Sequence, residues 1–373
     1  MLPDFSADES SSALFRSHLQ EVMALLQRSK FHSPDMRVSR EAAIEAVLPF
    51  EHGPADAKHC LLLVHGLTDT PFTFREVAAK LAEAGIRTRA ILLEGHGSCA
   101  EASLSVSGNS WRRQVRQHIE DLSTQGFHVW VGGFSLGGMI TTLEGLKHPD
   151  VEGLILWAPA WRSKNPLVWA SRFIAPFRRW HSRRPERDYT RYSSFSVNAI
   201  HQFHRLAIKA RRLLGSLSSF DKPVFICCSG SDATISTPYV WEQFRRLRRE
   251  DSELLWLGDL AEAQDEKGVD VWEASLPEQH IRTLSHCCLT FSERNSHYGR
   301  EGDYRHCLSR QFSREEWEAC MADPNIWYSE YGYPCPGGAG ARLTFNPHFD
   351  AMMDKVVSFL HHHAKLEVSD KTS

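Results

Sequence analysis

From residue 60 onward, short apolar runs alternate with segments of helical periodicity, and this alternation constrains the fold more than any other feature of the chain. The apolar runs cover residues 60–65, 127–131 and 151–157, a segment of alternating apolar and polar residues covers residues 86–93, and the helical patterns cover residues 72–84, 111–122 and 136–146. Strands separated by helices of about 10 to 15 residues cannot pair as hairpins and need crossover connections. The alternation therefore predicts an α/β fold, with a doubly wound, mostly parallel sheet and helices on both faces.

The alternation stops near residue 160 and resumes with another apolar run at residues 224–228. The intervening stretch is rich in arginine and aromatic residues, and its prolines, Pro166, Pro176 and Pro185, are expected to break it into short helices. We predict a helical cap at residues 161–220, inserted into a core of residues 51–160 and 221–373. Within that core, residues 290–345 are a predicted insertion. Residues 1–50 form a predicted N-terminal helical extension.

The composition is that of an ordinary globular chain, with 373 residues, 42% apolar residues, 24% charged residues and a formal net charge of −3. The near-neutral charge argues against nucleic-acid binding. No apolar run approaches the roughly 18 residues that a transmembrane helix requires. The first 15 residues lack the basic residues of a secretory signal. We therefore expect a cytoplasmic protein that is not integral to a membrane.

The nine cysteines favour the same location. Their number is odd, and two adjacent pairs, Cys227-Cys228 and Cys287-Cys288, lie in apolar runs, where free cysteine behaves as a small hydrophobic residue. We therefore expect free thiols rather than disulfides. No two cysteines have the CxxC spacing of a structural zinc site, so the sequence predicts neither a metal nor another cofactor.

The sharpest chemical signal is the stretch Gly133-Phe134-Ser135-Leu136-Gly137-Gly138. It directly follows the apolar run at residues 127–131 and directly precedes a helical pattern. A serine on such a strand-to-helix turn is held in a strained backbone conformation. Glycines two residues away on either side are required, because a Cβ atom there would collide with the neighbouring elements. The pattern is typical of a nucleophile elbow, and Ser135 is the candidate nucleophile.

A serine that attacks a carbonyl group needs two backbone N–H donors to bind the oxyanion that forms. One donor is the amide of the residue after the nucleophile, Leu136, and the other comes from the loop after an early strand. Leu67 is the candidate for the second donor, because Gly66 allows a sharp turn there. We expect His65 to shape this loop by hydrogen bonding rather than to act as a base.

These features resemble the α/β-hydrolase superfamily, and within it the group of monoacylglycerol lipases, bacterial carboxylesterases and serine aminopeptidase-like enzymes. The matching stretches are collinear over residues 60–160 and comprise His65-Gly66-Leu67-Thr68-Asp69-Thr70-Pro71-Phe72, Gly95-His96-Gly97, Asn109-Ser110-Trp111, the serine motif and Ala158-Pro159-Ala160. The resemblance implies a catalytic serine, acid and histidine in that chain order. His96 precedes the serine, so this order disfavours it as the base.

The resemblance places the acid in the loop after the strand that resumes beyond the cap, where Ser229-Gly230-Ser231-Asp232 follows residues 224–228. Asp232 is the candidate acid. For the base we favour His286, which follows the short apolar segment at residues 281–284 and lies in a stretch similar to the family's histidine region. His348, just before a predicted final helix at residues 349–360, is the alternative.

Together these residues predict a serine hydrolase that cleaves a carboxylic ester through an acyl-enzyme. Two alternatives stay open: an amide or peptide hydrolase with the same residues, and a binding protein without turnover. The expected partner is a small ester with an apolar acyl group. Aromatic residues of the cap, among them Trp161, Trp169, Phe173 and Phe177, either line an acyl pocket or bury the cap on the sheet. A third and weaker interpretation is that the cap contacts a membrane surface.

Overall fold

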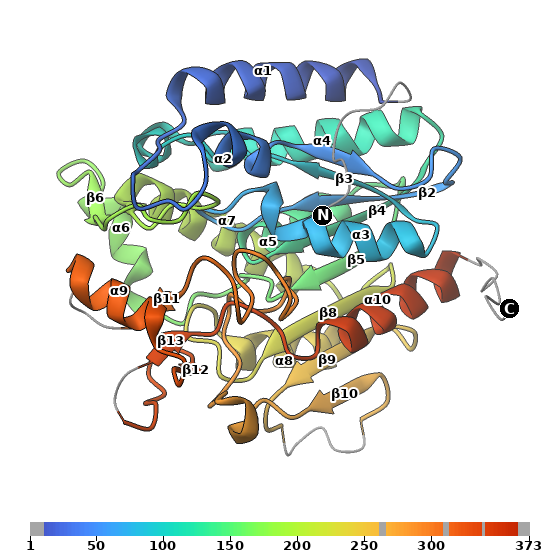
Figure 1. Cartoon of the computed structure of the whole chain (residues 1–373). Helices are drawn as coiled ribbons and strands as arrows, with labels where there is room; N and C mark the ends of the chain where they lie inside the picture. The colour runs from blue at the N-terminus through green and yellow to red at the C-terminus, as the bar shows by residue number, and fades with distance from the viewer. Residues whose placement is uncertain (1–10, 261–265, 309–312, 338–339, 365–373) are drawn as a thin grey trace, which may run out of the picture.

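A twisted sheet at the centre of the molecule organises the fold (Figure 1). The computed structural model describes residues 11–260, 266–308, 313–337 and 340–364. Within these ranges the central sheet has eight strands in the order β1-β3-β2-β4-β5-β8-β9-β10. Their bounds are β1 Phe50–His52, β2 His59–Val64, β3 Arg87–Ile91, β4 His128–Phe134, β5 Val151–Trp157, β8 Val224–Ser229, β9 Glu253–Leu257 and β10 Val269–Trp272. All neighbours run parallel except β1, which is antiparallel to β3, so the predicted sheet is confirmed.

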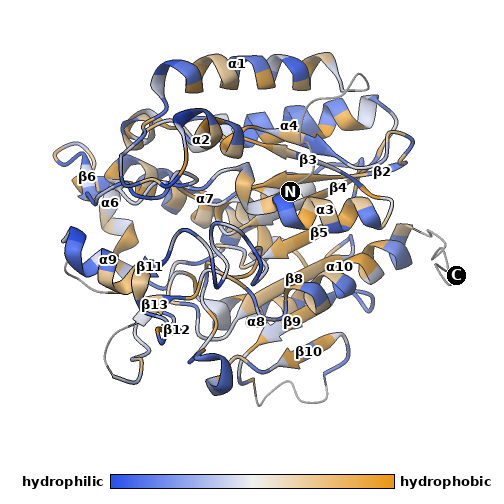
Figure 2. Ribbon diagram, viewed as in Figure 1, coloured by the Kyte–Doolittle hydropathy of each residue, from blue (hydrophilic) through white to orange (hydrophobic). Residues whose placement is uncertain are grey.

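Helices cover both faces of this sheet, so most side chains of its inner strands are buried and apolar, although β3 also buries Arg87 and Arg89. The main helices are α3 Arg75–Glu83, α4 Gly108–Thr124, α5 Leu136–Gly145, α7 Val197–Ser216, α8 Thr237–Leu247 and α10 Phe349–Ala364. Helix α3 packs against α10, and α4 packs against α5. Every side chain of β2 and β8 is buried, as expected for strands covered on both faces. Figure 2 shows these strands as hydrophobic bands between helices of mixed character.

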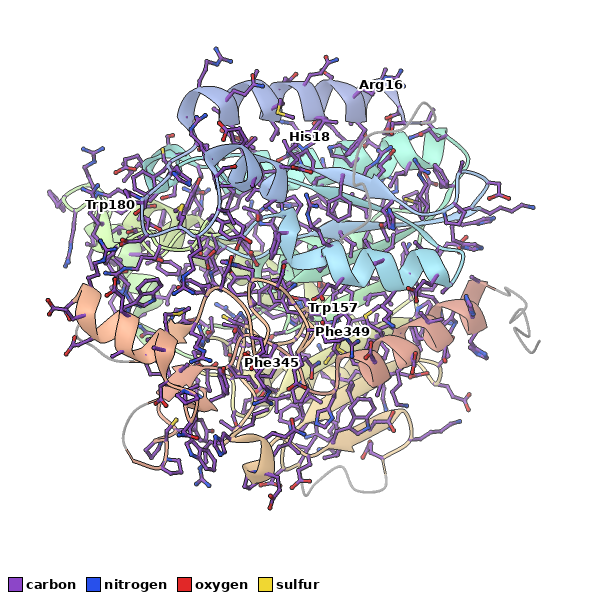
Figure 3. The ribbon with its side chains drawn as sticks, in the orientation of Figure 1. Arg16, His18, Trp157, Trp180, Phe345 and Phe349 are labelled. Atoms are coloured by element: carbon purple, nitrogen blue, oxygen red, sulfur yellow. A yellow bond between two sulfur atoms is a disulfide. The ribbon has the colours of Figure 1, made fainter. Side chains whose placement is uncertain are left out.

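Large aromatic side chains fill the core beside the sheet. Trp157, Phe345 and Phe349 are at most 3% exposed and belong to one cluster, and Figure 3 shows them in the interior, whereas Trp180 lies at the outer edge. Phe345 comes from the end of the predicted insertion. That segment therefore contributes to the main core rather than packing only on its surface.

The N-terminal region forms two helices, α1 Ala13–Ser29 and α2 Arg40–Val47. The Ser12 hydroxyl caps α1 by accepting the Phe15 amide, and Val22 and Leu26 pack with residues of α2 in a separate apolar cluster. Helix α1 lies over α4 at the top of Figure 1, with Arg16 and His18 labelled in Figure 3. Both helices lie within residues 1–50, where the sequence predicted a helical extension.

Residues 161–220 contain more structure than short helices. They form η3 Pro166–Ala170, α6 Ser171–Ile174, the short strands β6 Trp180–Ser182 and β7 Phe195–Ser196, and the 20-residue helix α7. The expectation of short helices alone was wrong, because no proline follows Pro185 in this segment and apolar residues recur at helical spacing along α7.

The aromatic residues of this segment divide into two groups. Trp161 is fully buried, whereas Trp169, Phe173 and Phe177 are 50%, 53% and 91% exposed. The exposed three do not bury the segment on the sheet, so of these four residues only Trp161 fits that interpretation. Their use in binding an acyl chain stays a prediction.

Residues 276–346 are mostly irregular. They include a small sheet of β11 His306–Cys307, β12 Trp327–Ser329 and β13 Gly340–Arg342, together with helix α9 Arg314–Ala322. The apolar segment at residues 281–284 is not a strand of the central sheet, since Ile281 makes only isolated bridges to Leu276 and Tyr328. The last strand of the central sheet, β10, ends at Trp272, well before His286.

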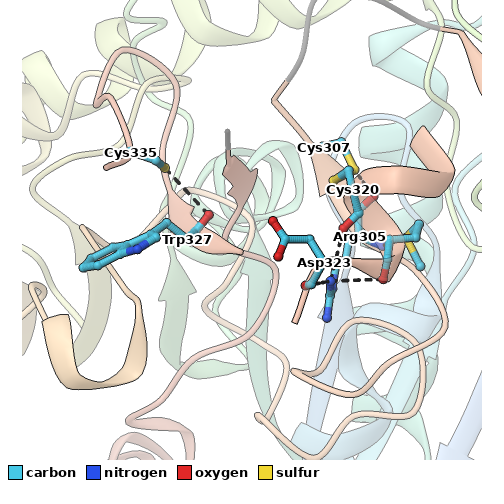
Figure 4. Close-up of a disulfide and its surroundings, with 7 residues drawn as sticks. Arg305, Cys307, Cys320, Asp323, Trp327 and Cys335 are labelled. Carbon is cyan, nitrogen blue, oxygen red and sulfur yellow. Dashed lines mark hydrogen bonds between the residues drawn. A yellow bond between two sulfur atoms is a disulfide. The ribbon is translucent and has the colours of Figure 1, made fainter. Parts of the chain in front are cut away.

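A disulfide joins Cys307 of β11 to Cys320 of α9 (Figure 4), so the expectation of free thiols was wrong for this pair. An odd total leaves at least one cysteine unpaired but does not exclude a bond between others, and the apolar-run argument concerned other positions. The remaining seven cysteines are free. Folding brings the Cα atoms of Cys307 and Cys320 to 6.3 Å, within the range that a disulfide bridges. Because disulfides are rare in the cytosol, this pair does not support the predicted cytoplasmic location.

The structure contains no transmembrane candidate within the residues it describes, since none of those helices is both long and apolar enough to cross a bilayer.

Candidate active site

Ser135 occupies a sharp turn between β4 and α5. Its backbone adopts φ 54° and ψ −111°, a conformation that residues other than glycine rarely adopt. A Cβ atom on Gly133 would lie 2.4 Å from the Gly137 carbonyl carbon, and one on Gly137 would lie 1.8 Å from the Val64 oxygen. Both glycines are therefore required by close backbone contacts, for the reason inferred from the sequence.

Asp232 and His286 meet Ser135 at the carboxyl edge of the sheet. Strands β4, β5 and β8 are neighbours, so the residues just after β4 and β8 lie close together. His286 Nε2 is 2.9 Å from Ser135 Oγ, and His286 Nδ1 is 2.5 Å from Asp232 Oδ2. The three candidates thus form one hydrogen-bonded chain, and each is at most 6% exposed.

The environment keeps Asp232 ionised. Burial alone would raise the pKa of this carboxyl, but His286 and the amides of Ile235 and Thr234 lower it more, so its pKa lies below the usual value of 3.8. Those amides donate to Asp232 Oδ1 at 2.9 and 2.7 Å. Asp232 Oδ1 is therefore held by its own loop, while Oδ2 is directed at the imidazole.

Two backbone amides beside the serine are candidate donors to a substrate oxygen. Leu67 follows β2, and Leu136 is the first residue of α5. Neither amide donates a hydrogen bond to another group in the described part of the protein. Thr68, next to Leu67, adopts φ 68°, which marks the sharp turn expected in this loop. An oxyanion hole requires such unpaired donors.

The other histidines considered from the sequence lie elsewhere. His65 accepts the Leu93 amide at Nε2 and contacts the Gly66 oxygen at Nδ1, so it holds the loop as expected. Burial and the neighbouring His96 lower the pKa of His65 well below 6.5. His96 contacts the Glu94 oxygen. His348 contacts the Glu273 oxygen and the Trp272 ring, away from Ser135.

A buried ion pair, which was not predicted from the sequence, holds the loops of His286 and Asp232 in place. Glu330 Oε2 accepts the His286 amide at 2.8 Å, and Arg342 donates to both oxygens of Glu330 at 2.7 and 2.9 Å. Arg342 also donates to Thr234 Oγ1 at 3.0 Å, beside Asp232. Glu330 is 0% exposed. Both residues come from the predicted insertion, where no motif or periodicity marks them.

No group of three or more histidine, cysteine, aspartate or glutamate side chains is arranged to hold a metal ion among the residues with described positions.

Comparison with known proteins covers part of this site. A family model described as serine aminopeptidase, S33, matches residues 55–190, about a third of the chain. That range includes β2, the serine turn and the start of the 161–220 segment. It ends before Asp232 and His286, so the match reaches only one of the three site residues.

Two bacterial relatives match overlapping parts of the chain. It is 32% identical over 105 residues to the thermostable monoacylglycerol lipase of Bacillus sp. (strain H-257), covering 28% of this chain and 40% of the lipase. It is 21% identical over 200 residues to the carboxylesterase of Bacillus subtilis (strain 168), covering 52% of this chain and 81% of the esterase. The chain therefore spans less than half of the lipase.

Solved structures share the fold. A structure reported for the metagenome-derived lipolytic enzymes LipS and LipT superposes with a TM-score of 0.50 at 21% identity, covering 57% of this chain and 87% of that chain. At this identity the likeness concerns the fold alone. The sheet order, the strand-turn-helix around Ser135 and these matches together place the chain in the α/β-hydrolase superfamily.

Proposed function

We propose that this protein is a serine hydrolase that cleaves a carboxylic ester through an acyl-enzyme, with Ser135, His286 and Asp232 as the catalytic residues. The observation that carries the proposal is the continuous chain of hydrogen bonds from Asp232 through His286 to Ser135. This arrangement gives a weakly nucleophilic hydroxyl a base and gives the base an orienting carboxylate.

In the first half of the reaction, Ser135 Oγ attacks the ester carbonyl carbon while its proton passes to His286 Nε2. The ionised Asp232 stabilises the resulting imidazolium. The amides of Leu67 and Leu136 donate to the oxyanion of the tetrahedral intermediate. The carbon–oxygen bond to the alcohol then breaks, and His286 returns the proton to the departing alcohol oxygen.

In the second half, a water molecule attacks the acyl carbon of the Ser135 ester while His286 removes its proton. The new tetrahedral intermediate collapses, the bond from the acyl carbon to Ser135 Oγ breaks, and Oγ regains its proton from His286. The products are a carboxylic acid and the enzyme in its starting form. Each step uses only side chains and amides already in place.

An ester is favoured over an amide because the two bacterial relatives are named as a monoacylglycerol lipase and a carboxylesterase. The name of the family model, serine aminopeptidase, keeps amide hydrolysis as the second candidate. Both reactions pass through the same kind of intermediate, so the comparison needs substrates that differ only in the leaving atom. In this proposal residues 161–220 act as the cap over the site, residues 51–160 and 221–373 form the hydrolase core, and the substrate is a small ester in the cytoplasm.

The proposal is tested with 4-nitrophenyl butyrate and the 4-nitroanilide of the same acid. We expect wild-type protein to hydrolyse the ester faster than the anilide. Ser135→Ala should lower kcat by a factor on the order of 10⁴ to 10⁶ with an unchanged circular dichroism spectrum. Ser123→Ala, on α4 and bonded to Asp150, is the matched control and should keep wild-type activity. Esterase activity that survives Ser135→Ala would remove Ser135 as the nucleophile.

A further inference from the structure

A cavity of about 250 Å³ lies between residues 184–195 and residues 304–342. These two stretches come from the predicted cap and the predicted insertion, and the elements around them, β6 and α6 on one side and α9 and β11 on the other, gather at one end of the sheet in Figure 1. The wall of the cavity is strongly basic. Five arginines line it, namely Arg184, Arg187, Arg191, Arg305 and Arg342, against two carboxylates, Asp188 and Glu316.

The cavity adjoins the candidate active site. Arg191 Nη1 lies 3.5 Å from the Sγ atom of Cys287, the residue after His286. The amide of Tyr192, which also lines the cavity, donates to the Thr68 oxygen at 2.8 Å, in the loop of the proposed oxyanion donor. Thr234 lines the cavity and donates its amide to Asp232. The wall is therefore built from immediate neighbours of the acid, the base and the oxyanion loop.

Part of this positive charge is not used by ion pairs. Arg342 pairs with Glu330, and Arg187 pairs with Asp35. Arg191 and Arg305 have no carboxylate within 4.0 Å in the ranges that the structure describes; Asp69 and Asp188 act on Arg191 from beyond that distance.

Asp188, the carboxylate of the wall that is nearest to Arg191 in sequence, already accepts hydrogen bonds from other residues. Asp188 Oδ1 accepts from His297 Nε2 at 3.0 Å, and Oδ2 accepts from the Tyr298 hydroxyl at 2.5 Å. Its pKa is lowered to about 2, because the bonds to His297 and the charges of His297 and Arg191 outweigh the effect of burial. Asp188 therefore binds the 290–345 segment as an ionised group.

His306, in the wall of the cavity, is affected by the positive charge of the arginines. Burial, and after it the charges of Arg342, Arg191 and Arg184, lower the pKa of His306 well below 6.5. The ring is therefore neutral, and it contacts the Tyr331 hydroxyl at 2.6 Å. Burial is the larger cause and disfavours any charge, but the arginine charges that also lower this pKa would stabilise an anion. Arginine forms paired hydrogen bonds to carboxylate and phosphate oxygens.

We propose that this cavity binds an anionic group, a carboxylate or a phosphate, carried by the ester that Ser135 cleaves. Arg191 is the principal contact, because it is the unpaired arginine nearest to His286. The inference rests on the proposed function and narrows it, since it replaces a purely apolar substrate with a charged one. The exposed aromatics of α6 remain available for an apolar portion of the same molecule.

Two matched pairs of esters test the proposal and distinguish the two anions. The first pair is 4-nitrophenyl hydrogen glutarate and 4-nitrophenyl pentanoate. The second pair is 1-butyrylglycerol 3-phosphate and 1-butyrylglycerol. We expect kcat/KM for the anionic member of at least one pair to exceed that of its neutral partner by about tenfold or more, and the preference to shrink as salt screens the charges. Preference in the first pair identifies a carboxylate, and preference in the second identifies a phosphate.

The variant Arg191→Gln should lower this anionic-to-neutral ratio by about tenfold. Its matched control is Arg183→Gln, since Arg183 is an exposed arginine of the same segment that pairs with Glu101; its ratio should equal that of the wild type. A neutral ester hydrolysed as well as the anionic one in both pairs would overturn the proposal. So would a preference that Arg191→Gln leaves intact.

If the proposed ester hydrolysis is wrong, the result is different: no ester of either pair is hydrolysed. Calorimetric titration of the wild-type protein with glutarate and with inorganic phosphate then tests the cavity by itself. Binding of either anion that Arg191→Gln weakens and Arg183→Gln does not would support an anion site without hydrolysis. Absence of binding of both would overturn it.

Discussion

Ser135 and His286 are held in place in two different ways. Ser135 lies on a turn whose shape depends on its immediate neighbours, since Gly133 and Gly137 allow the close backbone contacts there. His286 lies on an irregular segment fixed by contacts with distant residues: the Ser229 hydroxyl donates to the Leu284 oxygen, and Glu330 accepts the His286 amide. The proposed nucleophile is thus positioned by local sequence, and the proposed base is positioned by tertiary structure.

The largest expected effect distinguishes the two histidines that the sequence left as candidates. His286→Ala should lower kcat for 4-nitrophenyl butyrate nearly as much as Ser135→Ala does, and the double variant should lose little more, because catalytic groups of this kind act as a unit. His348→Ala should stay within about tenfold of the wild type. Steady-state kinetics on the wild type and the four variants provides the measurement, and the reverse order of the two histidine variants would contradict the assignment.

Glu330→Gln tests whether tertiary contacts position the base. The amide side chain keeps the size of Glu330 but loses the charge that holds both the His286 amide and Arg342. We expect kcat to fall by about 10- to 100-fold with KM little changed, since a misplaced base affects the reaction more than binding. Glu318→Gln, on the exposed face of α9, is the matched control.

Loss of the buried charge also destabilises the protein, because it leaves Arg342 without its partner. The double variant Glu330→Met with Arg342→Leu separates the two effects, since it removes both charges. If its melting temperature recovers while kcat stays low, Glu330 positions the base. If kcat recovers together with stability, the ion pair serves the fold alone.

Elements with a repeating pattern could be predicted from the sequence. The apolar runs predicted β2, β4, β5 and β8, because strands covered on both faces are mostly apolar, and the alternating segment at residues 86–93 predicted β3. Ser135, Asp232 and His286 were identified as site candidates, and the structure brings them together. The nucleophile was the simplest to identify, because its strand, turn and glycines are contiguous in the sequence.

Features fixed by contacts between distant residues could not be predicted. Glu330 and Arg342 lie in a segment with neither helical nor strand periodicity, and their pairing with the His286 loop depends on how that segment folds back. The disulfide was missed for the same reason, since Cys307 and Cys320 meet only after β11 and α9 pack together. The cavity between residues 184–195 and 304–342 likewise depends on two segments that are far apart in the chain.

Removal of the disulfide between Cys307 and Cys320 tests whether this bond stabilises the protein. Cys307→Ser should destabilise the protein by roughly 2–4 kcal/mol, the usual range for a disulfide, and lower kcat by less than Glu330→Gln does. Cys335→Ser, a free cysteine in the same segment, is the control and should match the wild type. Urea denaturation provides the measurement, and equal midpoints for Cys307→Ser and the wild type would show that the bond adds no stability.

The smallest expected effect concerns pH. Burial opposes protonation of His297, but Asp188 and Asp303 outweigh it and raise the pKa of His297 above 6.5. The stabilisation from this group is therefore fully present below about pH 6.5 and is lost as pH rises through the raised pKa. The melting temperature of the wild type should fall more steeply from about pH 6 to pH 9 than that of His297→Gln. Parallel curves for the two proteins would contradict the coupling.

Labelling with a fluorophosphonate tests the central claim most directly, because this reagent reacts quickly only with an activated serine. Intact-mass and peptide analysis of the wild-type protein should find one adduct, on Ser135. His286→Ala should label far more slowly, His348→Ala should label at close to the wild-type rate, and Ser135→Ala should not label at all. An adduct on another residue, or a folded wild-type protein that does not react, would contradict the account.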